Sequence, residues 1–110
     1  MKALITGSNG TIGNKLKRFL QFYGVEVYTW DRSKTSIFDY YAMEEYIQKL
    51  KPDVVYHLAI ASTLNKLENE TWKVNHEWPS ELAWVCRIHQ IKFIFTSSYE
   101  VFSDYNNGPF

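Results

Sequence analysis

Three glycines, Gly7, Gly10 and Gly13, recur at every third position near the start of this 110-residue chain. They lie between a short apolar run, residues 2–6, and a helical pattern. Such a turn lets a pyrophosphate approach the backbone N–H groups at a helix N-terminus, where the helix dipole favours an anion. The structural alternative is a plain strand-to-helix connection. A P-loop is excluded, because Asn14 follows Gly13 where that motif requires lysine.

A candidate carboxylate follows the next apolar run. Asp31 comes directly after residues 25–30, eighteen positions beyond Gly13. A carboxylate there would accept hydrogen bonds from both hydroxyls of an adenosine ribose and would repel a 2′-phosphate, which favours NAD over NADP. Arg32 could instead favour that phosphate, so NADP stays open. The structural alternative for Asp31 and Arg32 is a solvated turn.

The other residue types able to do chemistry give weaker signals. His57, His76 and His89 are far apart in the chain, so we expect no metal site among them. Cys86 lies within a helical apolar pattern and is expected to be a small core residue. Because it is the only cysteine, an internal disulfide is excluded, which agrees with a reducing compartment.

Alternating strands and helices must position these residues. Apolar runs rich in β-branched and aromatic residues predict strands at residues 2–6, 25–30, 54–58 and 92–96. Helical spacing predicts a helix over roughly residues 11–23, a second between an N-cap at Asp39 and Pro52, and a third with the stripe Val74, Trp78, Leu82 and Val85. Continuous apolar strands separated by helices predict an α/β fold: a Rossmann-type parallel sheet with helices on both faces, cut short after its fourth strand.

Composition limits the function classes. With 45% hydrophobic and 22% charged residues, residues 1–110 are expected to form one globular domain. Twelve Lys and Arg balance twelve Asp and Glu, so there is no basic field for nucleic acid or an anionic membrane surface. No apolar stretch approaches the ~20 residues that span a bilayer. We therefore expect a cytoplasmic protein, with neither nucleic acid nor a membrane as partner.

Together these residues resemble the extended branch of the short-chain dehydrogenase/reductase superfamily, which comprises sugar-nucleotide epimerases, dehydratases and reductases. The family's opening Thr-Gly-x-x-Gly-x-x-Gly is matched by Thr6 to Gly13, and its acidic residue after the second strand by Asp31. Its Pro-Asp-x-Val-x-His-Leu-Ala strand is matched by Pro52 to Ala59. The likeness spans the whole chain.

Later motifs of the family are matched as well. Residues 74–75 resemble its helical Val-Asn, and residues 95–98 followed by Val-Phe at 101–102 resemble the end of its catalytic strand. Counting back from that Val-Phe pair assigns the family's catalytic hydroxyl to Ser98. The last loop looks closest to that of the dTDP-4-dehydrorhamnose reductase-like members.

The resemblance implies a nicotinamide dinucleotide as cofactor, NAD with NADP as the alternative, and no metal. It also implies that Asp39 reaches the adenine amino group and that Ser98 orients a hydroxyl or carbonyl of a nucleotide-sugar substrate in the full-length relative. The implied cofactor-binding residues are Gly7, Asn9, Gly10, Thr11, Ile12, Gly13, Asp31, Arg32, Asp39, Leu58, Ala59, Ala61, Asn75 and Thr96.

The chain departs from the family in one respect. The family's Tyr-x-x-x-Lys, which supplies the general acid and its lysine, does not occur: Tyr46 is followed at that spacing by Leu50, and Tyr99 by Ser103. Without that phenol, hydride transfer lacks its proton partner. We therefore expect the cofactor-binding part of an oxidoreductase or epimerase, catalytically incomplete and without the substrate-binding C-terminal portion. The alternative is a non-catalytic Rossmann-like binding or structural module.

Three tryptophans indicate self-association. Trp72, Trp78 and Trp84 recur every six residues, so they point about 120° apart around a helix and cannot all face one core. We therefore expect a homodimer or a larger assembly, through this helix or through an exposed edge of the fourth strand. Pro79 lacks the N–H that would bond the carbonyl of Asn75, which predicts a distortion of the helix there.

Overall fold

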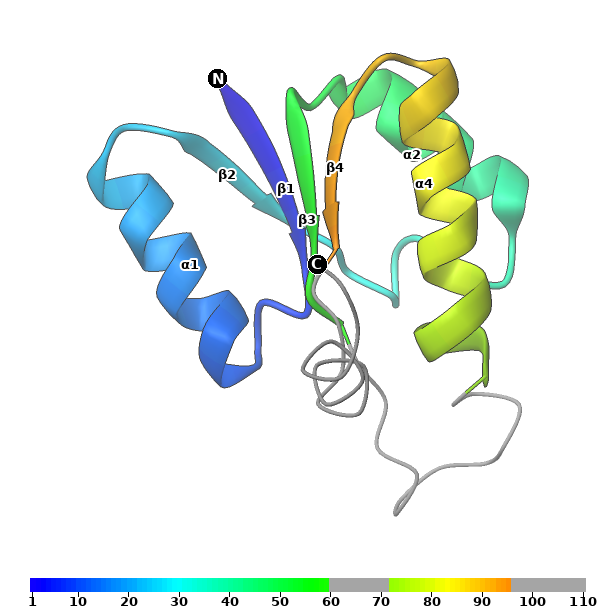
Figure 1. Ribbon diagram of the computed structural model, residues 1–110, viewed down its shortest axis with the longest axis horizontal. Coiled ribbons are helices and arrows are strands. Elements are labelled where there is room, and N and C mark those ends of the chain that lie inside the picture. Colours follow the sequence, from blue (N-terminus) through cyan, green and yellow to red (C-terminus); the bar gives the residue numbers. More distant parts are fainter. Residues whose placement is uncertain (60–71, 96–110) are drawn as a thin grey trace, which may run out of the picture.

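A computed structural model describes residues 1–59 and 72–95 of the chain. In these ranges four strands form one parallel sheet in the order β2-β1-β3-β4 (Figure 1). The strands are β1 (Lys2–Thr6), β2 (Glu26–Thr29), β3 (Val54–His57) and β4 (Lys92–Phe95). Each lies within a range predicted from the sequence, and each adjacent pair is parallel as expected.

Helices cover both faces of this sheet. They are α1 (Thr11–Phe22), α2 (Tyr40–Leu50) and α4 (Trp78–Ile88), the last preceded by a π-helical turn, η1 (Lys73–Glu77). Figure 1 shows α1 on one face of the sheet and α2 and α4 together on the other. The predicted α/β fold of Rossmann type is therefore confirmed. No helix in the described part of the chain is long and apolar enough to cross a bilayer.

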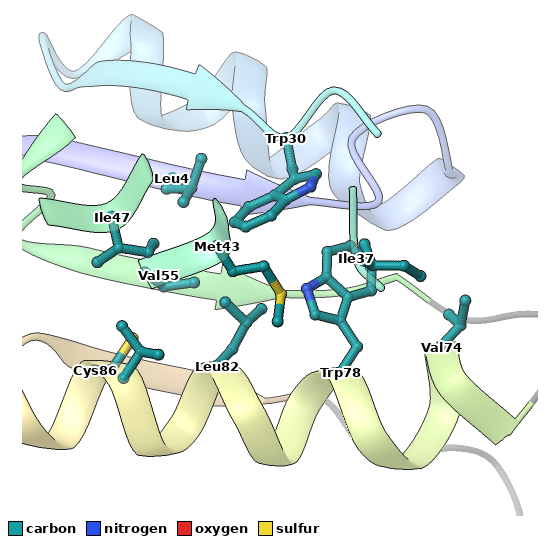
Figure 2. Packing of buried hydrophobic residues seen from close by; sticks show 11 residues of the cluster. Leu4, Trp30, Ile37, Met43, Ile47, Val55, Val74, Trp78, Leu82 and Cys86 are labelled. Atoms are coloured by element: carbon teal, nitrogen blue, oxygen red, sulfur yellow. The ribbon is translucent and has the colours of Figure 1, made fainter. Parts of the chain in front are cut away.

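Two apolar clusters hold the helices to the sheet. Successive strand residues point to opposite faces, so Leu4 and Val55 face α2 and α4, whereas Ala3, Ile5 and Val54 face α1. Figure 2 shows the larger cluster, to which α2 and α4 with η1 contribute Met43, Ile47, Val74, Trp78, Leu82 and Cys86. The predicted stripe on the third helix is thus buried. Cys86 is a core residue as expected, and burial raises the pKa of its thiol to about 11.

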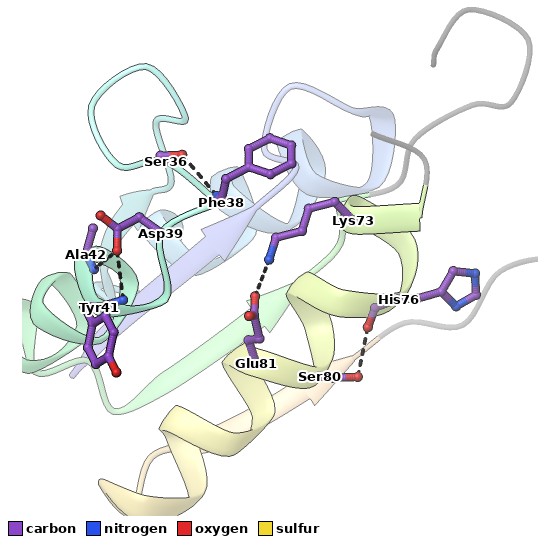
Figure 3. A network of polar contacts seen from close by, with 9 residues as sticks. All are labelled: Ser36, Phe38, Asp39, Tyr41, Ala42, Lys73, His76, Ser80 and Glu81. Atoms are coloured by element: carbon purple, nitrogen blue, oxygen red, sulfur yellow. Dashed lines mark hydrogen bonds and ion pairs between the residues drawn. The ribbon is translucent and has the colours of Figure 1, made fainter. Parts of the chain in front are cut away.

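The start of α2 is fixed by a side-chain cap. The Asp39 carboxylate accepts hydrogen bonds from the N–H groups of Tyr41 and Ala42, at 3.1 and 3.2 Å (Figure 3). These N–H groups have no partner inside the helix, so the cap satisfies donors that would otherwise need water. The predicted N-cap at Asp39 is confirmed.

The segment before Pro79 is not regular α-helix. In η1 the N–H of Trp78 donates to the carbonyl of Lys73, five residues earlier, so this turn is wider than an α-helical turn. Because Pro79 has no N–H, the regular hydrogen-bond ladder is interrupted at that position in any case. The distortion predicted at Pro79 is therefore a π-helical turn directly before it.

An ion pair ties η1 to α4. The Lys73 ammonium contacts the Glu81 carboxylate at 2.6 Å, and the lysine side chain is almost fully buried (Figure 3). The same ammonium lies 5.9 Å from the ring centroid of Phe38, in the segment before α2. A buried lysine is stable only when its charge is paired. The pair therefore fixes η1 against the rest of this face of the fold.

Candidate functional site

A cavity of about 630 Å³ lies where β1, β2 and β3 end. In an open parallel sheet, ligands bind beyond the carboxyl ends of the strands, so this is the expected position for a site. The residue after β1, the turn after β2 and the residues after β3 all contribute to its wall. Of the residues implicated by the sequence, those that line it are Gly7, Asn9, Gly10, Asp31, Arg32, Leu58 and Ala59.

The glycine-rich turn after β1 depends on two of its glycines for its shape. Gly7 has a φ of +73°, and a Cβ there would lie 2.7 Å from the backbone nitrogen of Ala59. A Cβ on Gly13 would lie 2.2 Å from the carbonyl oxygen of Gly7. Gly10 differs, because among the described residues its Cβ would meet one atom, the Gly7 carbonyl oxygen, at an ordinary contact distance of 3.4 Å. Packing within the described residues therefore requires glycine at positions 7 and 13, whereas position 10, in the cavity wall, could accommodate a Cβ.

The N-terminus of α1 has its backbone donors available. Thr11, Ile12 and Gly13 form its first turn, and the first hydrogen bond inside the helix runs from Asn14 N–H to the Gly10 carbonyl. No side chain caps this end and its first turn holds no acidic residue. The N–H groups of the first turn, together with the helix dipole, therefore suit a bound anion such as phosphate.

Asp31 and the residues after it form a compact turn after β2, which is another part of the cavity wall. The Asp31 carboxylate accepts hydrogen bonds from the N–H and the hydroxyl of Ser33, at 2.9 and 2.6 Å. These bonds, helped by the charge of Lys34, hold the pKa of Asp31 below its usual value. The group is therefore an exposed, ionised carboxylate in the cavity wall.

Tryptophans form part of the same wall, which sequence reasoning missed. Trp30 and Trp78 both line the cavity, and their rings meet edge to face at a centroid distance of 5.5 Å. The Trp30 indole N–H donates to the carbonyl of Thr35 at 3.0 Å, which closes the turn after β2. The sequence signal was Trp30 itself, a large aromatic residue directly before the candidate carboxylate.

Thr6 joins the ends of β1 and β3 beneath the cavity, and this contact was also missed. Its hydroxyl oxygen accepts hydrogen bonds from the N–H groups of Leu58 and Ala59, at 3.1 and 3.2 Å. With both lone pairs used, the hydroxyl donates its proton to Nδ1 of His57, 2.9 Å away. His57 therefore carries its own proton on Nε2. Burial lowers the pKa of this imidazole to about 4, so the ring is neutral near pH 7.

Other implicated residues lie away from the cavity wall or outside the described residues. Asp39 caps α2 and is not among the residues that line the cavity, so the described geometry gives it a structural role. Asn75 lies in η1 and likewise does not line the cavity. Ala61, Thr96 and Ser98 lie outside the described residues.

The three histidines occupy separate places. His57 packs edge to face on Trp78, His76 lies against Trp72, and His89 contacts Glu44 at 3.2 Å. Within residues 1–59 and 72–95, no group of three or more His, Cys, Asp or Glu side chains could hold a metal ion.

A parallel sheet with a glycine-rich turn after its first strand and an acidic residue after its second defines a Rossmann-type α/β domain. The family model described as the RmlD substrate binding domain matches residues 1–110, and the chain belongs to this family. This confirms the predicted resemblance to dTDP-4-dehydrorhamnose reductase-like members of the extended short-chain dehydrogenases. No curated protein sequence gives a significant match.

Solved structures support the same assignment. A dTDP-4-dehydrorhamnose reductase from Clostridium acetobutylicum is 29% identical with a TM-score of 0.74, over 84% of this chain and 34% of that one. The reductase from Yersinia enterocolitica is 26% identical with a TM-score of 0.75, over 88% and 35%. A short-chain dehydrogenase/reductase superfamily protein from Agrobacterium tumefaciens, solved with bound NAD, is 25% identical with a TM-score of 0.76, over 92% and 34%. The chain thus spans about a third of the length of these proteins.

Proposed function

We propose that this chain binds NAD and forms the cofactor-binding part of a nucleotide-sugar oxidoreductase or epimerase. One observation carries the proposal: the glycine-rich turn and the carboxylate of Asp31 line the same cavity. The first suits a pyrophosphate and the second suits a ribose, which are neighbouring parts of one dinucleotide. Similar proteins solved with bound NAD or NADP support a nicotinamide dinucleotide as the ligand.

The residues present fit such a cofactor. Gly10 lines the cavity, and because it has no Cβ it leaves room there for the pyrophosphate to approach the backbone. The uncapped N-terminus of α1 supplies N–H donors for the phosphate oxygens. The ionised carboxylate of Asp31 would accept hydrogen bonds from the ribose hydroxyls and would repel the 2′-phosphate of NADP. This supports NAD, with NADP as the weaker ligand.

The nicotinamide of the bound cofactor would donate or accept the hydride, according to its redox state, while these residues would bind and orient it. In the whole protein, we infer that Ser98 orients a hydroxyl or carbonyl of a nucleotide sugar. Asp39, Ala61, Asn75 and Thr96 remain proposed contacts to the cofactor. Tyr-x-x-x-Lys does not occur in these 110 residues, so we expect the chain alone to bind cofactor without turning over a nucleotide sugar.

The proposal is tested by titration calorimetry of NAD into the chain and into a Gly10→Val variant. The φ of Gly10 is −77° with extended ψ, a conformation that suits valine, so we expect the variant to fold. Its side chain would occupy the space through which the pyrophosphate approaches, so NAD binding should be lost. No heat from the unaltered chain with millimolar NAD or NADP would overturn the proposal.

Gly24→Ala is the matched control. Gly24 lies beyond α1, away from the cavity, and its φ is +82°, a conformation that costs alanine about 1–2 kcal/mol. This variant should lose stability but keep NAD affinity, whereas Gly10→Val should keep stability and lose affinity. Loss of NAD binding in both variants would mean that binding only reports stability.

We further propose that the protein is a cytoplasmic homodimer. Self-association is supported by two exposed apolar side chains on α4, Trp84 and Ile88. The absence of any helix suited to a membrane in the described residues is compatible with this location.

A further inference from the structure

The turn after β2 is fastened at both of its ends. The Asp31 carbonyl accepts hydrogen bonds from the N–H groups of Lys34 and Thr35, at 3.0 and 2.9 Å. The Trp30 indole N–H holds the far end through the Thr35 carbonyl, at 3.0 Å. Trp30 itself is buried in the main apolar cluster. The backbone that carries Asp31, Arg32 and Ser33 is therefore a fixed part of the cavity wall.

Within this turn, Ser33 donates both of its hydrogen bonds to one oxygen of the Asp31 carboxylate. Its N–H and its hydroxyl both donate to Oδ1 of Asp31, at 2.9 and 2.6 Å. A carboxylate oxygen has two lone pairs, so these two bonds occupy Oδ1. Oδ2 is then the oxygen able to accept hydrogen bonds from a ligand. Two bonds to one oxygen also restrict rotation of the carboxylate about its χ2 angle.

We propose that Ser33 is a positioning residue that sets the choice between NAD and NADP. This inference rests on the proposed binding of a dinucleotide. By holding Oδ1, Ser33 keeps Oδ2 turned toward the ribose hydroxyls of NAD. It also prevents the carboxylate from rotating away when a 2′-phosphate approaches, so the fixed negative charge repels the 2′-phosphate of NADP.

The neighbouring charges explain why the serine matters. Arg32 lines the cavity and Lys34 lies close enough to Asp31 to favour its ionised form. Both cations would attract the 2′-phosphate if the carboxylate moved away. Removing the Ser33 hydroxyl should therefore lower the affinity for NAD, because Oδ2 loses its fixed orientation. The affinity for NADP should fall less or should rise.

The test compares Ser33→Ala, Ser33→Thr and Ser36→Ala by titration calorimetry with NAD and with NADP. Ser36 is the matched control, because its hydroxyl also makes a local hydrogen bond, accepting from the N–H of Phe38 at 3.1 Å, but Ser36 does not line the cavity. In Ser33→Ala we expect the NAD dissociation constant to rise about tenfold and the NADP constant to change by less than about twofold. Ser33→Thr should keep the original ratio of the NAD and NADP dissociation constants, and Ser36→Ala should leave this ratio unchanged.

Two results would overturn the inference while leaving cofactor binding in place. If Ser33→Ala lowers the affinity for NAD and NADP equally, the hydroxyl supports the structure of the turn and does not set the choice of cofactor. A selective loss of NADP would mean that the hydroxyl binds the 2′-phosphate instead of the carboxylate. If the unaltered chain binds neither cofactor, the proposed function fails and this inference fails with it.

Discussion

At the scale of single residues, the neutral imidazole of His57 links the cavity to the stability of the sheet. Its Nδ1 accepts a hydrogen bond from the Thr6 hydroxyl, and that hydroxyl oxygen in turn accepts hydrogen bonds from the N–H groups of Leu58 and Ala59 in the cavity wall. A protonated ring could not accept that bond, because both nitrogens of an imidazolium are donors. Protonation of His57 would therefore disturb the junction between β1 and β3.

This arrangement predicts a loss of stability in mild acid. Burial lowers the pKa of His57 from 6.5 to about 4, so between these values the unfolded chain binds the proton that the folded chain excludes. The neutral His57 side chain makes its full contribution to the free energy of unfolding above its pKa in the unfolded chain. This contribution decreases as the pH falls toward the pKa in the folded chain, by at most ~1.4 kcal/mol per pH unit. Urea unfolding at pH 7, 6 and 5 measures this slope.

The control is a His57→Gln variant, whose side chain does not titrate. It should be less stable than the unaltered chain at pH 7, and its free energy of unfolding should change less between pH 7 and 5. Equal slopes for the two proteins would show that other groups, such as carboxylates, cause the acid sensitivity.

At the scale of elements, different glycines of the glycine-rich turn serve folding and ligand binding. A Cβ on Gly7 or Gly13 would lie closer to backbone atoms than any Cβ tolerates, whereas a Cβ on Gly10 would meet the Gly7 carbonyl oxygen at an ordinary contact distance, 3.4 Å. A Gly13→Ala variant should therefore lose about 3 kcal/mol of unfolding free energy, because the Gly7 carbonyl must move to admit the new carbon. Gly10→Ala should stay close to the unaltered chain. Similar stabilities of both variants in urea unfolding would contradict this division.

The sequence predicted the elements well because each carries its own local signal. Apolar runs marked the strands, helical spacing marked the stripe from Val74 to Val85, and Asp39 marked the start of α2. Contacts between distant segments had no such signal. The bond between Thr6 and His57 spans fifty-one positions, and nothing in either residue type specifies the other as its partner.

One local feature of the site could have been recognised from the sequence. An Asp followed two residues later by Ser is a common turn in which the carboxylate accepts the backbone N–H, so the link from Asp31 to Ser33 was open to sequence reasoning. Asp39 had two readings, a helix cap and a contact to adenine, and the sequence could not rank them. The structure supplies direct hydrogen bonds for the first reading.

At the scale of the whole molecule, α4 presents apolar surface that its own core does not cover. Trp78 is 1% exposed, whereas Trp72 and Trp84 are 58% and 56% exposed. This agrees with the prediction that the three rings cannot share one face. Ile88 is also exposed, one helical turn after Trp84, so the outer side of α4 carries a pair of adjacent apolar side chains. At β4, which has one strand neighbour among the described residues, the aromatic side chain of Phe95 is also exposed.

These surfaces predict a homodimer that uses α4, and the alternative is association through β4. Light scattering should report twice the 13.0 kDa chain mass in the high-micromolar range, and Trp84→Glu should return the protein to a monomer, because a buried unpaired charge opposes the interface. Phe22→Glu is the matched control, since Phe22 is an exposed aromatic on α1, on the other face of the sheet. A dimer that survives Trp84→Glu but is lost in Phe95→Glu would identify β4 as the interface, because a charge there opposes pairing of the strand edge. A monomeric unaltered chain would contradict both routes.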